Sequence, residues 1–250
     1  MQLEEFAARL RRSGDIVFFT GAGISTESGV PDFRSPGGIW TKYQPVYFQD
    51  FVTSETARIH HWQLKKATYE LYKKVQPNIG HYSIRDFEKR GQLLGLITQN
   101  IDGLHGIAGV SDEKIVELHG TDRLVTCLQC GKRFEPAGVY ENLGEEFIAP
   151  TCDACGGLLK SANVSFGQQM PAAAMKRAQA WSEQAEVFIV IGSSLQVQPA
   201  ASFPVIAKRN GALLAIINRD ETPLNDLADF VYSGGIGEFF KKLNALLADA

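Results

Sequence analysis

Short apolar runs alternate along the chain with longer segments in which apolar residues recur at helical spacing. The apolar runs have the length of buried strands and occupy residues 15–20, 93–98, 114–118, 186–191, 212–217 and 229–232. Segments compatible with amphipathic helices lie between several of them, notably residues 79–90, 171–184, 199–210 and 236–249. Strands that alternate with helices favour a mostly parallel sheet covered on both faces. The pattern therefore predicts an α/β fold.

Two segments do not follow this alternation. Residues 35–78 are rich in aromatic and polar side chains, and we expect them to form loops and helices over the edge of the sheet. Residues 123–160 contain all four cysteines and are expected to form a separate small module. The sequence thus predicts a core domain that is interrupted twice, with the two insertions packed together as a second domain. The predicted core comprises residues 1–34, 79–122 and 161–250.

Composition and charge narrow the class of protein. A chain of 250 residues with 44% hydrophobic and 21% charged residues is typical of a globular protein. The net charge of −3 gives no basic field that would favour nucleic acid or an anionic membrane as a partner. The N-terminal segment carries charges between its apolar residues, unlike a signal peptide, and the apolar runs are too short to span a bilayer. We therefore expect a cytoplasmic protein.

A glycine-rich turn follows the first predicted strand. Gly21 and Gly23 lack a Cβ, so the backbone can turn sharply there and approach a phosphate closely. A helix that opens after such a turn directs its N–H groups toward an anion. However, Thr26 replaces the third glycine of the dinucleotide fingerprint, and no strand with an acidic end follows at the usual distance. The turn predicts dinucleotide binding without ordinary hydride transfer.

The four cysteines are arranged as two Cys-x-x-Cys pairs. Cys127 and Cys130 form the first pair, and Cys152 and Cys155 form the second. Each spacing lets both sulfur atoms face one point, so the pairs can together complete a tetrahedral thiolate site for zinc. Two disulfides, or unrelated buried cysteines, are the alternatives. Four thiolates leave no open position, so a bound zinc would be structural.

Polar residues follow four of the predicted strands at the points where the strands end. They are Gln99, Asn100 and Asp102 after the second run, His119 after the third, Gly192, Ser193 and Ser194 after the fourth, and Asn218 after the fifth. Ligands of open α/β sheets bind at the carboxyl ends of the strands. Any one of these residues could merely cap a helix. Four such strand ends together predict a ligand-binding edge.

The five histidines are expected to differ in role. His60 and His61 lie in a polar stretch of helical spacing and are expected at the surface. His81 is expected to be structural at the start of a helix, whereas His105 could have a hydrogen-bonding or a functional role. His119 ends a strand at the predicted ligand edge, and imidazole titrates near neutral pH. It is therefore the candidate general base.

The motifs occur in the order seen in sirtuins, and the chain resembles that family over nearly its whole length. They are GAGISTESGVPDFR at 21–34, QNIDGLH at 99–105 with Ala108 and Gly109, LHG at 118–120, the two cysteine pairs, Phe166–Gly167, GSSLQVQPA at 192–200 and Asn218. Sirtuins are NAD-dependent protein lysine deacetylases or deacylases, and the resemblance is to the prokaryotic type. It implies a Rossmann-like large domain and a smaller domain made of a zinc ribbon and a helical insertion. NAD and an acyl-lysine peptide would meet between the two domains.

The resemblance also implies residue roles. The NAD-binding set is Gly21, Ala22, Gly23, Ser25, Thr26, Phe33 and Arg34 over the diphosphate and nicotinamide ribose, Gln99 and Asn100 at that ribose, Ile101 and Asp102 at the nicotinamide carboxamide, Gly192, Ser193 and Ser194 at phosphate and adenine ribose, and Asn218, Gly235 and Ile236 on the adenosine side. The peptide would be flanked by Val164, Ser165, Phe166, Gly167 and Val197 and would pair with their backbone as an added strand. His119 and Asn100 would be catalytic, and Cys127, Cys130, Cys152 and Cys155 would bind zinc.

The implied reaction begins when nicotinamide leaves the ribose C1′ and the acyl oxygen of the substrate lysine attacks that carbon. Positive charge builds on the ribose, so a closed, dry pocket with fixed dipoles favours this step. His119 then acts as general base on a ribose hydroxyl, which attacks the acyl carbon. Water completes the reaction, giving free lysine and O-acyl-ADP-ribose.

Departures from the family pattern bear on the substrate. Gln168 stands where many sirtuins carry a glutamate, and Ser161 follows Lys160 where many carry a proline. Members that prefer succinyl or malonyl groups carry a Tyr-x-x-Arg pair, whose nearest match here is Trp62 and Lys65. An acetyl or other uncharged acyl group is therefore expected. The alternatives are an NAD glycohydrolase or ADP-ribosyltransferase that uses the same pocket, and an NAD-sensing module whose ribbon contacts nucleic acid, which the acidic net charge disfavours.

Overall fold

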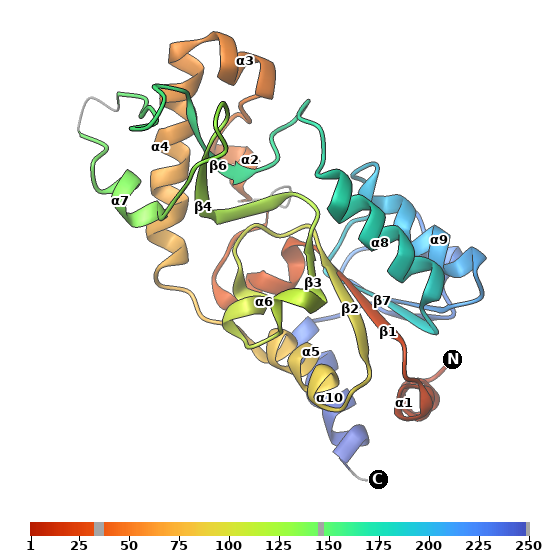
Figure 1. The fold of residues 1–250 in the computed structure, drawn as a ribbon. Helices are drawn as coiled ribbons and strands as arrows, with labels where there is room; N and C mark the ends of the chain where they lie inside the picture. Colours follow the sequence, from red (N-terminus) through yellow and green to blue (C-terminus); the bar gives the residue numbers. More distant parts are fainter. Residues whose placement is uncertain (33–37, 145–147, 249–250) are drawn as a thin grey trace.

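The computed structural model describes residues 1–32, 38–144 and 148–248 of the chain. All six predicted strands form, and together they make one parallel sheet (Figure 1). The strand order is β3 (Ile115–Glu117), β2 (Leu93–Thr98), β1 (Ile16–Thr20), β7 (Val187–Ile191), β8 (Leu213–Ile217) and β9 (Phe230–Tyr232). The sheet grows from β1 in one direction and, from β7 onward, in the other. This is the Rossmann-like order, and it confirms the predicted fold class.

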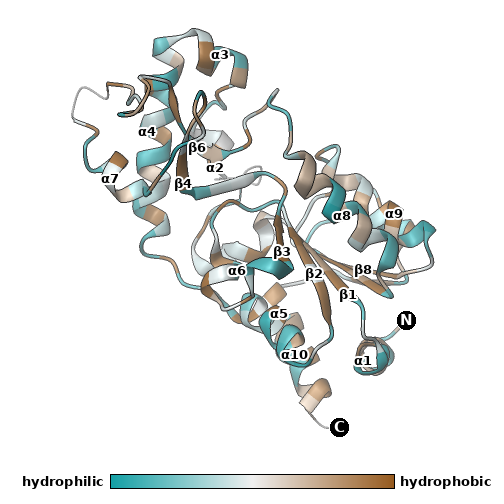
Figure 2. Cartoon of the chain, viewed as in Figure 1, coloured by the Kyte–Doolittle hydropathy of each residue, from teal (hydrophilic) through white to brown (hydrophobic). Residues whose placement is uncertain are grey.

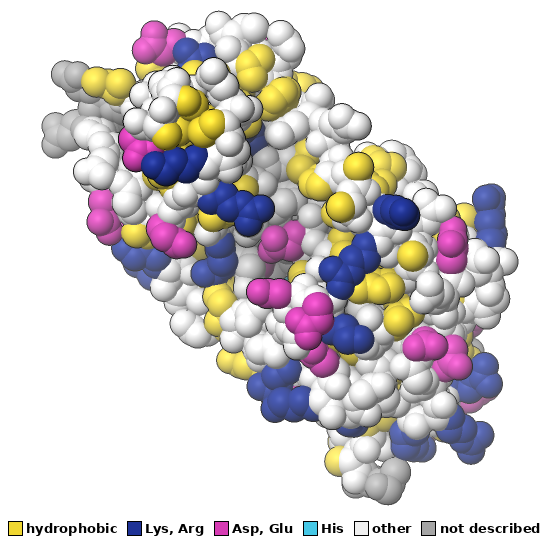
Figure 3. All heavy atoms as spheres, viewed as in Figure 1, with side chains coloured by type: hydrophobic (Ala, Val, Ile, Leu, Met, Phe, Trp, Pro, Cys, Tyr) yellow, Lys and Arg dark blue, Asp and Glu magenta, His cyan; other side chains and the backbone are white. Residues whose placement is uncertain are grey.

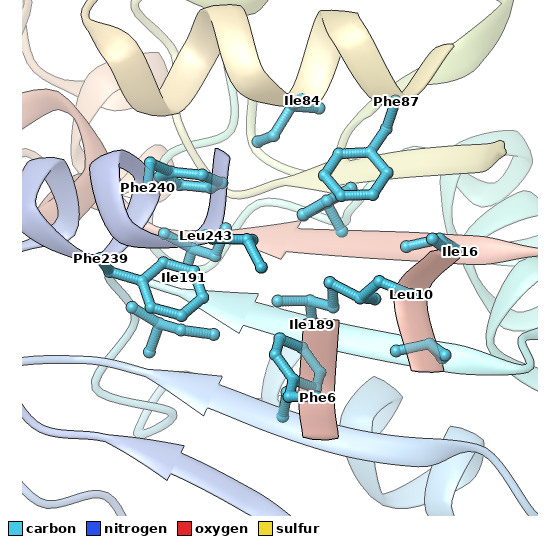
Figure 4. Packing of buried hydrophobic residues seen from close by; sticks show 14 of the residues in the cluster. Phe6, Leu10, Ile16, Ile84, Phe87, Ile189, Ile191, Phe239, Phe240 and Leu243 are labelled. Atoms are coloured by element: carbon cyan, nitrogen blue, oxygen red, sulfur yellow. The ribbon is translucent and has the colours of Figure 1, made fainter. Parts of the chain in front are cut away.

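One face of the sheet is covered by three helices, two of which lie in segments that were expected to be helical. They are α1 (Leu3–Arg12), α5 (Ile79–Lys89) and α10 (Ile236–Ala248). Figure 4 shows side chains of β1 and β7 pointing into the space that these helices enclose, where Ile16 and Ile189 meet Phe6, Phe87 and Phe240. Burial of these apolar surfaces fixes the helices on the sheet.

The opposite face is covered by α8 (Ala172–Gln184) and α9 (Phe203–Arg209). Successive side chains of a strand point to opposite faces, so Val17 and Phe19 of β1 belong to this second core, whereas Ile16 and Phe18 belong to the first. Because both faces are covered, β1 and β2 are hydrophobic along their length, as Figure 2 shows. Shorter helices complete the connections, namely α6 (Leu104–Ile107) and the 3-10 helices Ala22–Ser28, Asp112–Lys114, Ala200–Ser202 and Asn225–Leu227.

A second, three-stranded antiparallel sheet contains the cysteine module. Its order is β5 (Arg133–Phe134), β4 (Gly120–Cys127) and β6 (Leu159–Asn163), and α7 (Pro136–Tyr140) follows β5. The first insertion forms α2 (Ile39–Lys42), α3 (Phe48–Thr53) and the long α4 (Glu55–Tyr72), which runs beside this sheet in Figure 1.

The packing of α4 corrects the expectation that residues 35–78 cover the edge of the parallel sheet. Trp62 of α4 is fully buried in one core with Tyr140, Leu159 and Cys127. The small sheet has too few apolar residues to bury a core alone, so it recruits the apolar face of α4.

The surface shows mixed charge. Figure 3 shows basic and acidic side chains interspersed over the visible face. Within the described part of the chain, none of the helices combines the length and the apolar character that crossing a membrane requires.

Candidate functional site

The glycine turn after β1 meets the loop after β7 at the point where the strand order reverses. The Gly23 N–H donates to the Gly192 carbonyl at 2.9 Å. A Cβ at Gly23 would lie 2.7 Å from the Gly192 Cα, and one at Gly21 would lie 2.6 Å from the Gly192 oxygen. The two loops therefore interlock backbone to backbone, which only glycine permits. The helix that follows Gly21 is the 3-10 helix Ala22–Ser28 and not the longer helix of a dinucleotide fingerprint.

A cleft of about 630 Å³ opens at this edge of the sheet. It is lined by most of the residues that the sequence selected: Gly21, Ala22, Gly23, Thr26, Gln99, Asn100, Ile101, His119, Val164, Ser165, Phe166, Gly167, Gly192, Ser193, Ser194, Val197, Asn218, Gly235 and Ile236. These residues come from both ends of the chain and from loops around both sheets. A volume of this size lies within the range of ligand-binding pockets.

Two selected residues do not contribute to this lining. Ser25 and Asp102 are buried and lie outside the lining of the cleft. Phe33 and Arg34 lie outside the described residues.

His119 is half-buried at the end of β3, and its hydrogen bond defines its tautomer. Its Nδ1 lies 3.0 Å from the Gln99 carbonyl oxygen. A carbonyl only accepts, so Nδ1 carries the hydrogen and the lone pair of the neutral ring is on Nε2. The backbone carbonyl of His119 in turn accepts the Val164 N–H at 2.7 Å. This arrangement presents a basic nitrogen at fixed orientation beside the strip Val164–Gly167.

Gln99 and Asn100 connect the ends of neighbouring strands. Gln99 Nε2 donates to Ser193 Oγ at 2.8 Å. The Asn100 side-chain amide donates to the Gly21 carbonyl at 3.2 Å and to Ser25 Oγ at 3.3 Å. Because Asn100 is buried at 4% exposure and held from two sides, its side chain is preorganised at the cleft wall.

A buried chain of hydrogen bonds supports the cleft floor. His81 Nδ1 accepts the Asn78 N–H, so Nε2–H donates to Ser25 Oγ at 3.4 Å. Ser25 Oγ donates to Asp102 Oδ2 at 2.8 Å. Burial lowers the pKa of His81 to about 4 and raises the pKa of Asp102, so the histidine is neutral at pH 7. His81 also completes a capping box with Asn78, which confirms its predicted role at a helix start.

His105 has a hydrogen-bonding role. Its Nε2 lies 3.0 Å from Thr20 Oγ1, which donates to Thr98 Oγ1 at 2.8 Å and therefore accepts from the ring. Its buried Nδ1 has no hydrogen-bond partner among the described residues. Complete burial lowers the pKa of His105, so the ring stays neutral and links β1, β2 and α6.

The prediction for His61 was wrong, whereas His60 is exposed as expected. His61 is 3% exposed, and its Nε2 lies 3.1 Å from Ser161 Oγ. It occupies the face of α4 that lines the cleft, together with Leu64, Lys65 and Thr68. The stretch is polar, but its neighbours belong to β6, which no local pattern in α4 could indicate.

Sequence reasoning also missed a buried ion pair in the cleft wall. Lys65 Nζ donates to both carboxylate oxygens of Asp122, at 2.7 and 2.8 Å, and both side chains are less than 10% exposed. The two residues are 57 positions apart, so only the tertiary fold brings them together. A paired charge of this kind presents a polar surface with little net charge to the cleft.

Glu117, two residues before His119, is half-buried, and burial raises its pKa to about 7, with the nearby Asp102 charge as a smaller cause. The folded state thus favours the protonated acid, whereas the unfolded chain ionises near pH 4.5. Stability contributed by this group is lost as pH rises from 4.5 toward 7. We predict that Glu117→Gln raises the free energy of unfolding relative to wild type. This gain should be about 2 kcal/mol larger at pH 8 than at pH 5.5.

Urea unfolding at both pH values measures this difference. Glu113→Gln, on an exposed 3-10 turn nearby, is the matched control and should leave stability at both pH values unchanged. An equal effect of Glu117→Gln at both pH values would show that burial does not hold this carboxyl protonated.

The four cysteines converge as the spacing predicts. Cys127 Sγ lies 3.6 Å from Cys155 Sγ, Cys130 Sγ lies 3.7 Å from Cys152 Sγ, and all four sulfurs lie within 4.8 Å of one another. A tetrahedron with zinc about 2.3 Å from each sulfur separates the sulfurs by roughly 3.8 Å. Disulfides would require about 2 Å, and all four cysteines are free. The residues therefore fit a structural zinc and exclude the paired-disulfide alternative.

Comparison with known proteins agrees with this geometry. The profile of the Sir2 family matches residues 21–199. An NAD-dependent protein deacetylase of Rhodopseudomonas palustris is 45% identical over 236 residues, which cover 94% of this chain and 93% of the relative. NAD-dependent protein deacetylase 1 of Bradyrhizobium diazoefficiens is 44% identical over 236 residues, covering 94% and 92%. A solved structure of Sir2 with a p53 peptide and NAD+ superposes with a TM-score of 0.90 at 36% identity over 100% of both chains. With most of its length matched by the family profile and with bacterial relatives at this identity, the chain belongs to the Sir2 family, the sirtuins.

Proposed function

We propose that this protein is an NAD-dependent lysine deacetylase that releases nicotinamide and O-acyl-ADP-ribose. One observation carries the proposal: His119, with its lone pair on Nε2, lines the same cleft as the glycine turn and Asn100. A base beside a dinucleotide site suits removal of a proton from a ribose hydroxyl. The relatives named as NAD-dependent protein deacetylases support the same reaction.

The proposed division of labour follows the positions of the side chains. Gln99 and Asn100 hold the nicotinamide ribose, since both amides are fixed at the cleft wall. Ile101 lines the cleft. Asp102, which follows it in the sequence, is buried and accepts a hydrogen bond from Ser25 Oγ, and the two residues are proposed to receive the carboxamide together. Preorganised dipoles around the ribose lower the cost of developing positive charge. His119 Nε2 then acts as general base.

The remaining NAD contacts follow from the loops at the other strand ends. Gly192, Ser193 and Ser194 lie opposite the glycine turn and would contact phosphate and ribose. Asn218, Gly235 and Ile236 line the cleft beyond β8 and would contact the adenosine. Glu27 fixes this end, because its carboxylate accepts the Gly237 N–H at 2.8 Å. Phe33 and Arg34 are proposed as part of the loop over the diphosphate, as the resemblance implies.

The peptide is proposed to lie along Val164–Gly167, with Val197 on its other side. The Phe166 carbonyl is already engaged by the Phe48 N–H at 2.9 Å, and Gln168 Oε1 accepts the Ser165 N–H at 3.1 Å. Together with the Gln168 N–H, which donates to the Ser165 carbonyl at 3.0 Å, these bonds fix the strip as a turn at the wall of the cleft. A glutamate at position 168 would accept the same N–H, so the glutamine preserves the turn while removing a charge.

An uncharged acyl group is the proposed substrate, with acetyl the simplest case. Lys65 is the nearest match to the arginine of the Tyr-x-x-Arg pair, and its Nζ donates to both carboxylate oxygens of Asp122. A succinyl or malonyl carboxylate would have to displace Asp122 from a buried ion pair, and that exchange is costly.

Mass spectrometry of the products tests the reaction and the acyl preference together. The protein is incubated with NAD and matched lysine peptides that carry acetyl, butyryl or succinyl groups. We predict nicotinamide and O-acyl-ADP-ribose only when peptide is present, with acetyl-lysine turned over faster than succinyl-lysine. Steady nicotinamide release without peptide would instead support an NAD glycohydrolase, and ADP-ribose attached to protein would support a transferase.

The domain boundaries and the location in the cell are also proposals. We propose that residues 1–34, 79–122 and 161–250 form the NAD-binding domain and that residues 35–78 and 123–160 form the smaller one. The shared core around Trp62 supports the second grouping. Four thiols held for zinc, and a need for NAD, favour the reducing cytoplasm.

A further inference from the structure

Lys160 is a buried cation that the proposed reaction does not use. It lies on β6, is 1% exposed and forms no ion pair with any described carboxylate. Its Nζ instead contacts three oxygen atoms: the Asn163 carbonyl at 2.5 Å, Asn163 Oδ1 at 3.0 Å and the Ser161 carbonyl at 3.3 Å. Three acceptors around one nitrogen match the three hydrogens of an ammonium group. A buried charge without a carboxylate partner is rare and requires an explanation.

The residue that Lys160 holds leads directly to the proposed peptide strip. Asn163 pairs with Gly120 in the antiparallel sheet and lines the cleft. The next residue, Val164, donates its N–H to the His119 carbonyl. A shift of Asn163 would therefore move the start of the strip relative to the candidate base.

Other contacts around Lys160 fix the same turn. Ser161 Oγ donates to Asn163 Oδ1 at 2.9 Å and accepts from His61 Nε2 at 3.1 Å. The Asn163 side chain thus receives hydrogen bonds from both Lys160 and Ser161. Asn163 has no alternative anchor of comparable strength in the described residues, because hydrogen bonds from an ion are about twice as strong as neutral ones.

The surroundings of Lys160 make its charge depend on pH in the neutral range. Burial, and to a smaller extent the charge of Lys65 on α4, lower the pKa of Lys160 to about 7, whereas Asp122 on β4 opposes the shift. Asp122 is already shared with Lys65, and burial lowers the pKa of His61, which leaves that ring neutral. A neutral Lys160 has only two hydrogens for three oxygens, so one acceptor would then face a lone pair.

We propose that Lys160, in its ammonium form, is a positioning residue that fixes Asn163 and thereby orders the strip Val164–Gly167 for the acyl-lysine peptide. This inference rests on the proposed deacetylase function and adds a determinant of peptide affinity to it. Lys160 does not touch the reacting atoms. Its loss should therefore raise the KM for peptide while sparing kcat and the KM for NAD.

Steady-state kinetics of the zinc-loaded protein test the proposal between pH 6 and pH 9. The substrate is an acetyl-lysine peptide with blocked ends and no other titratable group. For wild type we expect the peptide KM to rise as pH passes through about 7, in the window set by the lysine. Lys160→Met should raise the peptide KM roughly tenfold at pH 6, with kcat within about twofold, and should abolish its pH dependence.

Two further variants separate positioning from a merely structural role. Lys160→Arg keeps the charge throughout this range and should hold the peptide KM low at pH 9. Lys176→Met, which removes an exposed lysine from α8, should behave as wild type. A peptide KM in wild type that is flat from pH 6 to 9 would overturn the proposal, even if the Met and Arg variants failed to fold. The proposal would also be overturned if Lys160→Met lowered kcat and raised the KM for NAD by as much as it raised the KM for peptide. Absence of wild-type turnover on any acyl peptide would instead remove the deacetylase function, and this inference with it.

Discussion

His119→Ala should abolish turnover of acetyl-lysine peptides while NAD still binds. Removal of a general base costs typically 10²- to 10⁴-fold in rate, and here no neighbouring imidazole can substitute. His61, His81 and His105 are each buried and committed to other hydrogen bonds. Quenched-flow measurement of O-acyl-ADP-ribose gives the rate, and calorimetric titration with NAD gives the affinity.

Controls distinguish loss of the base from loss of the fold. His60→Ala changes an exposed histidine of α4 and should retain full activity. The backbone bond from Val164 to the His119 carbonyl does not depend on the imidazole, so His119→Ala should keep its affinity for peptide. Turnover by His119→Ala at the wild-type rate would remove this residue from the proposed role.

Loss of zinc should unfold the small antiparallel sheet and the cluster around it. Structural zinc sites of this type contribute roughly 10 kcal/mol or more of binding energy to folding. Cys127 and Cys152 belong to the same buried core as Trp62, so the metal and this core should fail together. After chelation, we expect rapid hydrogen exchange at β4 and β6 and slow exchange retained at β1, β2 and β7.

Cys152→Ser should reproduce the effect of the chelator, with zinc content measured by atomic absorption. Ser202→Ala changes a half-buried serine of the 3-10 helix Ala200–Ser202, outside the cysteine module, and is the comparison variant. Reductant separates metal from disulfide chemistry, because a disulfide-stabilised module would be lost in dithiothreitol whereas a zinc-bound one would persist. Full protection of β4 after complete zinc removal would contradict the prediction.

Much of the fold was predictable because its signals are local. The central strands β1, β7 and β8 are buried along their whole length and are almost entirely apolar, since both faces of the sheet are covered. Because the carboxyl ends of parallel strands meet at one edge of the sheet, Gln99, His119 and Gly192 can be placed together without knowledge of any long-range contact. The two Cys-x-x-Cys pairs likewise predict, from local spacing, that the sulfur atoms of each pair face one point.

The remaining features depend on contacts between distant segments. Nothing near Lys65 in the sequence indicates that Asp122 will neutralise it, and nothing near His61 indicates Ser161. The polar character of α4 suggested exposure, but the helix is covered by a sheet that cannot complete its own core. Polar residues become buried there because partners on β4 and β6 satisfy them.

The bond from the Val164 N–H to the His119 carbonyl has a consequence for substrate length. In the proposed reaction, the peptide beside Val164 and the imidazole that acts on the ribose are both positioned by the same short piece of backbone. The distance from the peptide main chain to the reacting ribose is then fixed, and the acylated side chain of the substrate must span it. We therefore expect acetyl-lysine to be turned over much faster than acetyl-ornithine, whose side chain is one methylene shorter.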